Sequence, residues 1–142
     1  VELSDSSEHF ASVHCDMAGY DPRWVYHGCL IGSAAAAARI LHGLLAGKLL
    51  ASDSLDQMLE RRPLGGAIEG RPWVQCGYGL GLMSGAFSAA GRAIGHSGAG
   101  LGSVCAVYHF PDRADPLTVA CFNDGPDEGV TEHAAAAIAR DL

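Results

Sequence analysis

The order of apolar and polar residues predicts helices in the first half of the chain. Residues 34–46 are almost all alanine, leucine and other strong helix formers, with Ser33 as an N-cap and Gly47 as a stop. Because this run is apolar on nearly every face, we expect a buried helix. A second helix is expected to begin at Ser54, which forms a capping box with Gln57.

The second half of the chain has the short alternating pattern of β-strands. Residues 104–110 and 117–122 read as two strands joined by a turn rich in Pro and Asp, so we expect a hairpin. Strand-like alternation also covers residues 73–85, and a further short strand is expected over 91–96. Glycines recur at every second position within 73–85, which predicts that another backbone or a ligand approaches that face closely. A last helix is expected after Pro126.

The remaining segments are expected to be loops. Residues 1–28 are polar and mixed, and residues 61–72 are rich in Gly and Pro. The predicted order is two helices, three or four antiparallel strands and a final helix. This is an α+β domain in which helices cover an antiparallel sheet. The length of 142 residues fits a single domain.

Composition and charge exclude several classes of protein. Apolar residues make up 49% of the chain and charged residues 18%, which argues against disorder. A net charge of −7 disfavours nucleic acids and anionic membranes as partners. No apolar run approaches the ~20 residues that a membrane helix needs.

The start of the chain leaves the localisation open. The first ten residues lack the basic start and the apolar core of a signal peptide. The first residue is Val1, not methionine, so we expect the chain to begin inside a longer gene product.

We expect no metal, no cofactor and no disulfide framework. His9, His14 and His27 cluster in the N-terminal loop and could bind a metal, but they lack helix or hairpin spacing. The five cysteines are odd in number and include no C-x-x-C pair. We interpret them as small, mostly buried hydrophobes. They are Cys15, Cys29, Cys76, Cys105 and Cys121.

Two glycine-rich segments resemble nucleotide motifs without completing them. Gly77, Gly79 and Gly81 follow the G-x-G spacing of a dinucleotide fingerprint. However, no glycine stands at the third position of that fingerprint, and no βαβ unit surrounds the segment. Residues 95–103 lack the lysine of a phosphate loop.

Residues 95–99 (GHSGA) come close to the G-x-S-x-G elbow of α/β-hydrolases. A triad of Ser97, Asp124 and His133 would have the right chain order. However, the fifth position is Ala99, and a strand rather than a helix is expected after the serine. An esterase with Ser97 as nucleophile therefore stays as the weakest alternative.

Longer stretches of the chain resemble one family. The run GCLIGSAAAAARILHGLLAGKLLASDSLDQML is similar to a segment of the serine β-lactamase and penicillin-binding superfamily. The likeness is greatest to the class C-like branch, with its esterases and D-Ala-D-Ala carboxypeptidases. YGLGL at 78–82, GHSG at 95–98, the hairpin and the last helix follow in that family's order, and the resemblance extends from about Gly28 to Leu142. It implies the β-lactamase/transpeptidase-like fold and a serine hydrolase that cleaves an ester, amide or β-lactam.

One of the family's three site motifs is present, as His96-Ser97-Gly98. The resemblance gives His96 the place of the lysine in K-T-G, an electropositive donor near the nucleophile. It gives Ser97 a hydroxyl contact with the substrate, and Gly98 the space for the acyl group. The backbone N–H of Ala99 would be half of the oxyanion hole, where one donor contributes ~2.7–4 kcal/mol. Because a histidine can titrate near neutral pH, its contribution would depend more on pH than that of a lysine.

The other two motifs are missing. Leu45 stands where S-x-x-K needs a serine before Lys48, and Cys121 stands where Y-x-N needs a tyrosine before Asn123. The resemblance therefore implies that residues 1–142 are the C-terminal portion of a larger domain, with the nucleophile outside this chain. The expected partners are the N-terminal part of that fold and a small-molecule or peptide substrate. A non-catalytic binding or structural member of the same fold is the alternative.

Overall fold

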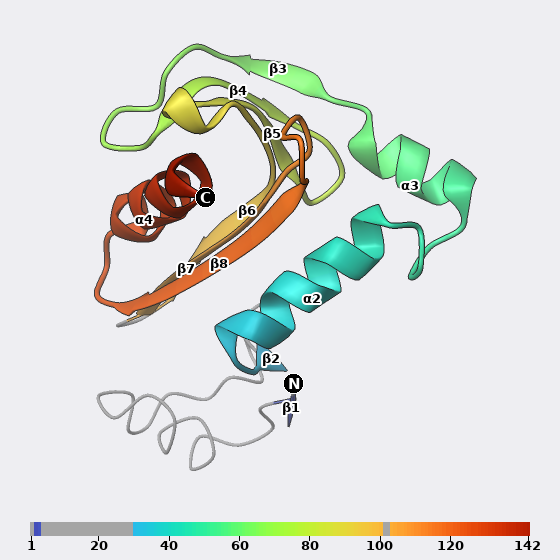
Figure 1. Ribbon diagram of the computed structural model, residues 1–142, viewed down its shortest axis with the longest axis horizontal. Helices are drawn as coiled ribbons and strands as arrows, with labels where there is room; N and C mark the ends of the chain where they lie inside the picture. The colour runs from blue at the N-terminus through green and yellow to red at the C-terminus, as the bar shows by residue number, and fades with distance from the viewer. Residues whose placement is uncertain (1, 4–29, 101–102) are drawn as a thin grey trace.

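The computed structural model describes residues 2–3, 30–100 and 103–142 (Figure 1). Most of the expected lead-in over 1–28 lies outside these residues, as do His9, His14 and His27. In chain order the elements are β1 (Glu2–Leu3), β2 (Leu30–Ile31), α2 (Ala34–Leu45), α3 (Ser52–Leu59), β3 (Arg62–Gly65), β4 (Trp73–Tyr78), β5 (Met83–Phe87), the 3-10 helix η3 (Ser88–Ala90), β6 (Arg92–Ala99), β7 (Ser103–Phe110), β8 (Leu117–Asp124) and α4 (Glu128–Asp141).

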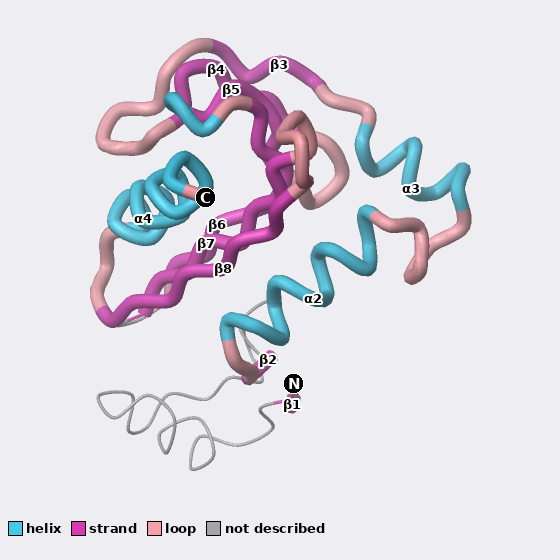
Figure 2. Tube along the Cα trace, viewed as in Figure 1, coloured by secondary structure: helices cyan, strands magenta, loops and turns pink. Residues whose placement is uncertain are grey.

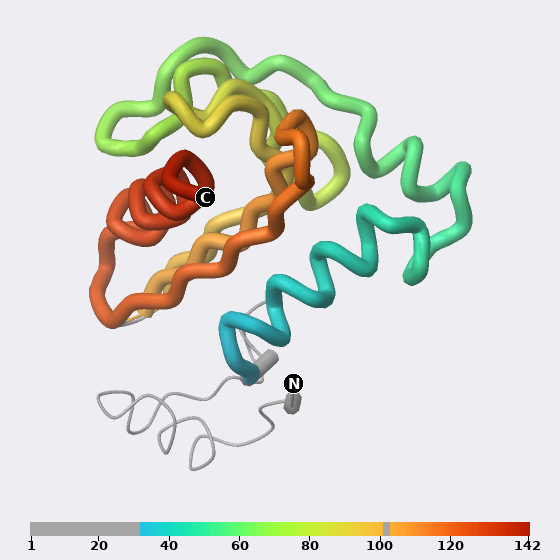
Figure 3. Tube along the Cα trace, viewed as in Figure 1, coloured from blue at the N-terminus to red at the C-terminus, as the bar shows by residue number. Residues whose placement is uncertain are grey.

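The predicted α+β class is confirmed, and the described sheet is larger than expected. Strands β3 to β8 form one antiparallel sheet in chain order, while β1 and β2 pair only with each other. Figure 2 shows the sheet curving around α4, and Figure 3 shows α4, at the end of the chain, on one side of β8 and α2 on the other. Each strand of the sheet is therefore hydrogen-bonded to the strands that precede and follow it in the sequence.

Two strands of the sheet were not predicted separately. Residues 61–72 were expected to be a loop, but Arg62–Gly65 pairs with β4. Its Pro63 cannot donate a ladder hydrogen bond, which is why the segment resembles a loop and is tolerated only at a sheet edge. Residues 73–85 were expected to be continuous, but a tight turn divides them. In that turn the Gly79 N–H donates to the Leu82 carbonyl at 2.8 Å.

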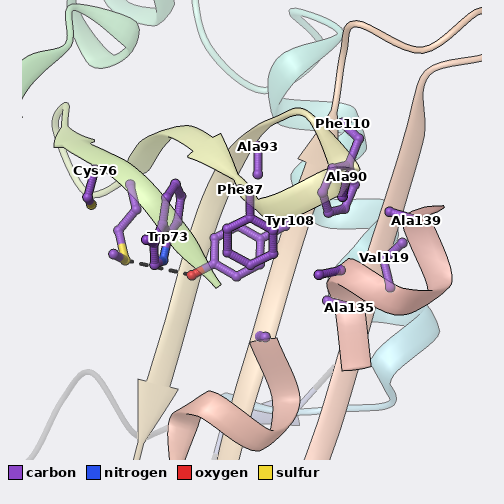
Figure 4. Close-up of a cluster of buried hydrophobic side chains, with 13 residues drawn as sticks. Trp73, Cys76, Phe87, Ala90, Ala93, Tyr108, Phe110, Val119, Ala135 and Ala139 are labelled. Carbon is purple, nitrogen blue, oxygen red and sulfur yellow. Dashed lines mark hydrogen bonds between the residues drawn. The ribbon is translucent and has the colours of Figure 1, made fainter. Parts of the chain in front are cut away.

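The main core lies between the sheet and α4. Trp73 packs edge-on against Phe87 and Tyr108, with ring centroids 4.6 and 5.6 Å away (Figure 4). Alanines of α4, including Ala135 and Ala139, are fully buried against these rings. Small residues on the helix allow it to approach the sheet closely enough to exclude water from the aromatic side chains.

The position of helix α2 was predicted correctly, but the expectation that the helix is buried was wrong. The Ser33 hydroxyl accepts from the Ala36 N–H at 3.2 Å, and Gly47 has the positive φ of +68° typical of a C-terminal stop. However, Leu41 is its only buried residue, and Ile40 is 46% exposed. The helix contacts β7 and β8 on one side, and nothing among the described residues covers its outer side.

The other two helices begin close to where the sequence placed them. Helix α3 begins at Ser52 with Ala51 as N-cap, so the observed cap lies three residues before the expected capping box at Ser54. The earlier start puts Asp53 in the first turn, where a negative charge is favourable. Helix α4 follows Pro126 as predicted, with Asp127 as N-cap. None of the helices in the described part of the chain has the length and apolar character needed to cross a membrane.

The two edges of the sheet differ. Strand β3 is short, contains Pro63 and has an irregular register with β4, all of which discourage further pairing. Strand β8 pairs with β7 in unbroken register over eight residues and has no described partner on its outer side. Phe122 on this strand is 47% exposed. Strand β8 therefore lacks the proline, the irregular register and the shortness that discourage further pairing at β3.

Candidate functional site

Strand β6 extends beyond its neighbour β5. Its pairing with β5 ends where Gly95 faces Met83, whereas its pairing with β7 continues to Ala99 facing Val104. Residues 96–99 therefore have a free backbone edge among the residues that the structure describes. The strand was expected to end at His96, but it continues through the whole H-S-G-A segment.

The direction of each backbone group at this edge follows from the β6–β7 ladder. The Gly100 N–H donates to the Ser103 carbonyl at 2.8 Å, which makes these two residues a hydrogen-bonded pair. Hydrogen-bonded and non-hydrogen-bonded pairs alternate in an antiparallel ladder, so the polar groups of His96 and Gly98 face β7. Those of Ser97 and Ala99 face the open edge. The Ala99 N–H thus points away from the sheet, where an extended ligand or an oxyanion could accept from it.

The exposed imidazole of His96 lies at this edge and contacts Tyr78. The Tyr78 hydroxyl is 2.5 Å from His96 Nε2, and the two rings meet edge-on with centroids 5.7 Å apart. The other ring nitrogen, Nδ1, lies against the Ser97 carbonyl oxygen, which can only accept. With the proton on Nδ1, this nitrogen donates to the Ser97 carbonyl and Nε2 accepts from the Tyr78 hydroxyl. The pair is held in place by its own hydrogen bonds.

The Ser97 side chain lies on the opposite face of β6 and is only 3% exposed. Its Oγ accepts from Arg71 Nη2 at 2.7 Å and donates to Glu128 Oε2 at 3.1 Å. The structure therefore does not bring this hydroxyl together with His96. In this arrangement the hydroxyl links β6 to α4 and to the loop before β4, and it has no direct access to a ligand at the open edge.

Below Ser97 lies a buried polar cluster, made of Arg71, Glu132, Tyr108 and Trp73. Glu132 has a fully buried side chain and receives Arg71 Nε at 2.6 Å, Arg71 Nη2 at 2.5 Å and the Tyr108 hydroxyl at 2.5 Å. The Trp73 indole N–H adds a bond of 3.2 Å. Every oxygen of the buried carboxylate is thus hydrogen-bonded, which such a charge requires.

The protonation of this cluster follows from its contacts. Burial raises the pKa of Glu132, but the hydrogen bonds from Arg71 and Tyr108 outweigh it, so the net pKa is lowered. The pKa of Tyr108 is raised, first by burial and then by the adjacent Glu132 charge. The hydrogen bond to Glu132 raises the pKa of Arg71 further. The cluster is therefore a carboxylate, a guanidinium and a neutral phenol, which is the protonation expected of a structural ion pair.

Gly98 shares the His96 face of the strand and lies opposite Cys105. A Cβ at Gly98 would come within 3.1 Å of Cys105 Sγ, so the missing side chain leaves space that this sulfur borders. Burial raises the pKa of the Cys105 thiol, which keeps it protonated. Cys105 thus forms part of the floor beside His96 and lacks the low pKa of a nucleophile.

The residues of the α/β-hydrolase alternative do not meet. Ser97 lies within a β-strand and not on a strand-to-helix turn, and its hydroxyl partners are Arg71 and Glu128. His133 and Asp124 are both exposed, on α4 and at the end of β8. Nothing in the described part of the chain activates Ser97 as that alternative requires.

Sequence reasoning did not identify Tyr78, Arg71 or Glu132. Glu132 lies on the same stripe of α4 as Ala135, Ala136 and Ala139, at spacings of three, four and seven residues. A charged residue on an apolar stripe of a helix is a sequence pattern from which a buried, paired charge could have been predicted. Arg71 lies in a loop without periodicity, and no local pattern marks it.

Neither a scan against protein-family models nor a search of curated proteins finds a match for this chain. The geometry of β6 is therefore the observation on which a functional conclusion rests.

Proposed function

We propose that this chain is part of a serine hydrolase related to the β-lactamase and penicillin-binding superfamily, with residues 96–99 lining its cleft. A nucleophilic serine supplied by another segment would attack an ester, amide or β-lactam at this edge. The Ala99 N–H would donate to the oxyanion, and His96 would face the reacting groups. Ser97 acts here as a positioning residue, which differs from the substrate contact that the resemblance implied.

The observation that carries the proposal is the free edge of β6. An acyl substrate that lies along this edge would meet the Ala99 N–H without any rearrangement of the sheet. Because the donor is part of the β6–β7 ladder, it is oriented before the substrate arrives. The buried cluster under Ser97 would keep the strand rigid, as a preorganised site requires.

Two surfaces that no described residue covers support a fold completed by a further segment. The outer edge of β8 is long and regular, and the outer side of α2 exposes Ile40 among other apolar residues. The two surfaces adjoin, because α2 contacts β8. A single additional segment could pair with β8 and pack on α2. We propose that this segment also carries the nucleophile.

One observation favours a non-catalytic member of the same fold. Both ring nitrogens of His96 already have partners, Tyr78 and the Ser97 carbonyl. A histidine engaged in this way is suited to shaping a binding edge, and it would have to release Tyr78 before it could exchange a proton with a substrate.

The proposal is tested on the protein with every segment that its gene encodes. The measurements are hydrolysis of a chromogenic ester and of a chromogenic cephalosporin, and covalent uptake of a labelled penicillin. We expect at least one signal, and we expect His96→Ala to reduce the rate about 10²-fold or more. His133→Ala is the matched control, because His133 is also exposed but lies on α4, and it should leave the rate unchanged.

Two outcomes would contradict the proposal. The complete protein could show no hydrolysis and no label, which would favour the non-catalytic alternative. The chain of 14.7 kDa could instead be active by itself, with a labelled serine inside residues 1–142. That result would move the nucleophile into this chain and overturn the family relationship.

A further inference from the structure

A cavity of about 510 Å³ lies on the face of the sheet that carries His96, two residues further back along β6. Its walls include Leu59, Ala86 and Ile94, and its polar lining includes Arg61 and Arg92. Helix α2 contacts mainly β7 and β8, and its Leu41 packs in one cluster with Ile94. The volume falls within the ~300–1,000 Å³ typical of small-molecule sites.

Arg61 is held over the sheet in an unusual way. A Cβ at Gly77 would come within 2.3 Å of Arg61 Nε, so the guanidinium occupies the place where a side chain of β4 would lie. Arg61 Nε donates to the Ser84 carbonyl at 2.9 Å, which fixes its orientation. Arg61 Nη2 is buried and has no hydrogen-bond partner among the described residues. A buried guanidinium nitrogen without a partner is costly, so a small movement of Arg61 that brought Nη2 to an acceptor in the cavity would remove that cost.

Arg92 supplies a second positive charge to the same cavity. Its partner is Asp112, with three contacts of 2.9–3.2 Å, and both side chains are half exposed. Exposed pairs of this kind contribute little to stability, so the guanidinium can turn toward a ligand at little cost. The residues that line this cavity include no carboxylate, and Asp112 pairs with Arg92 from outside the lining.

We propose that this cavity binds a small organic anion, with a carboxylate or phosphate head group on an apolar body. Arg61 and Arg92 would hold the head group, because a guanidinium pairs two N–H donors with two oxygens of either anion. Leu59 and Ile94 would pack against the apolar body. The inference rests on the cavity alone and does not depend on hydrolysis at the β6 edge.

The test is an NMR titration of the labelled chain with four probes. Benzoate and phenyl phosphate carry both a head group and an apolar ring, benzyl alcohol lacks the charge, and inorganic phosphate lacks the ring. We expect one or both of the first two to bind saturably and to shift the backbone amides of Ser84, Ala86 and Ile94. Which of the two binds more tightly identifies the head group. Benzyl alcohol and inorganic phosphate should bind more weakly.

Arg61→Gln and Arg92→Gln should each weaken the binding about tenfold or more, which corresponds to the loss of one charge-assisted contact. Arg62→Gln is the matched control, because Arg62 is the next residue, has the same charge and is exposed. If Arg61→Gln does not fold, Arg92→Gln and the comparison of benzoate with benzyl alcohol still decide the question. The proposal is wrong if no anion binds at about 10 mM, if benzyl alcohol binds as well as benzoate, or if Arg62→Gln weakens binding as much as Arg92→Gln.

Discussion

Arg71 and Glu132 form a two-pronged ion pair across 61 residues of sequence, with Nε 2.6 Å from Oε2 and Nη2 2.5 Å from Oε1. The pair joins the loop before β4 to the buried stripe of α4. It also supports Ser97 from below, since Arg71 Nη2 donates to the Ser97 hydroxyl. Three segments that are distant in the sequence thus depend on one guanidinium.

Removal of Arg71 should cost more stability than removal of the Glu132 charge. Arg71→Met leaves a carboxylate with a fully buried side chain and no counter-ion, which typically costs about 3–5 kcal/mol. Glu132→Gln keeps a hydrogen-bond acceptor and leaves a guanidinium that is 21% exposed, so its cost should be smaller. Urea unfolding of both variants and of the double variant measures this. Equal costs, or simple additivity in the double variant, would contradict the coupling.

The lowered pKa of the Glu132 carboxylate predicts that the free energy of unfolding decreases in acid. The folded-state pKa of Glu132 is lowered from its ordinary value of 4.5, so the unfolded chain binds a proton first as the pH falls. Its contribution is complete above pH 4.5 and is lost as the pH falls through the lower folded-state value. We expect the free energy of unfolding to decrease with falling pH in this window. Glu132→Gln should have a shallower slope there.

A second pH effect is expected at His109, which faces α2 from β7. The ring centroids of His109 and His42 are 6.4 Å apart. His109 Nδ1 is hydrogen-bonded to Thr118 Oγ1 at 2.8 Å. Burial lowers its pKa from 6.5, with smaller contributions from His42 and Arg92. The unfolded chain then takes up the proton first, so this stabilisation is complete above pH 6.5 and is lost as the pH falls through the lower folded-state value.

Unfolding measured between pH 7 and pH 5 should therefore show decreasing stability in the wild-type chain. His109→Asn should reduce that decrease. His133→Asn is the control, since the exposed His133 lies on α4 away from this contact, and it should leave the decrease unchanged. An unchanged slope in His109→Asn would show that the contact between α2 and the sheet does not respond to this group.

Gly79 should tolerate no side chain. A Cβ there would come within 2.2 Å of the Met58 carbonyl oxygen, which is backbone and cannot rotate away. We expect Gly79→Ala to lower the free energy of unfolding by about 1–3 kcal/mol. Gly66→Ala is the matched control, because nothing lies within 4 Å of a Cβ at Gly66, and its effect should stay within about 0.5 kcal/mol. Thermal or urea unfolding of the two variants gives the comparison.

Much of the fold was predictable because its signals are local. The cap at Ser33, the stop at Gly47 and the β7–β8 hairpin each depend on a few neighbouring residues. The prediction from the period-two glycines holds in part: the Met58 backbone approaches Gly79 as expected, whereas a side chain, that of Arg61, approaches Gly77. Strand β3 was missed because Pro63 has the local character of a loop, and only pairing with β4 makes the segment a strand.

The candidate site was less predictable, because its contacts are between distant segments. His96 and Ala99 could be chosen from one motif, but the side on which Ser97 lies depends on the register between β6 and its neighbours. Tyr78 reaches His96 from another strand, and Arg71 reaches Ser97 from a loop. The burial of α2 was overestimated because periodicity reports how apolar a helix is and not whether a partner covers it.

The alternation along β6 separates two kinds of evolutionary change within four residues. Substitutions at His96 or Gly98 alter the chemistry that a ligand meets and leave the buried cluster intact. Substitutions at Ser97 alter the support of the strand and leave the exposed face unchanged. If the edge binds a ligand as proposed, variation in what it recognises can accumulate at alternate positions without loss of the fold that presents it.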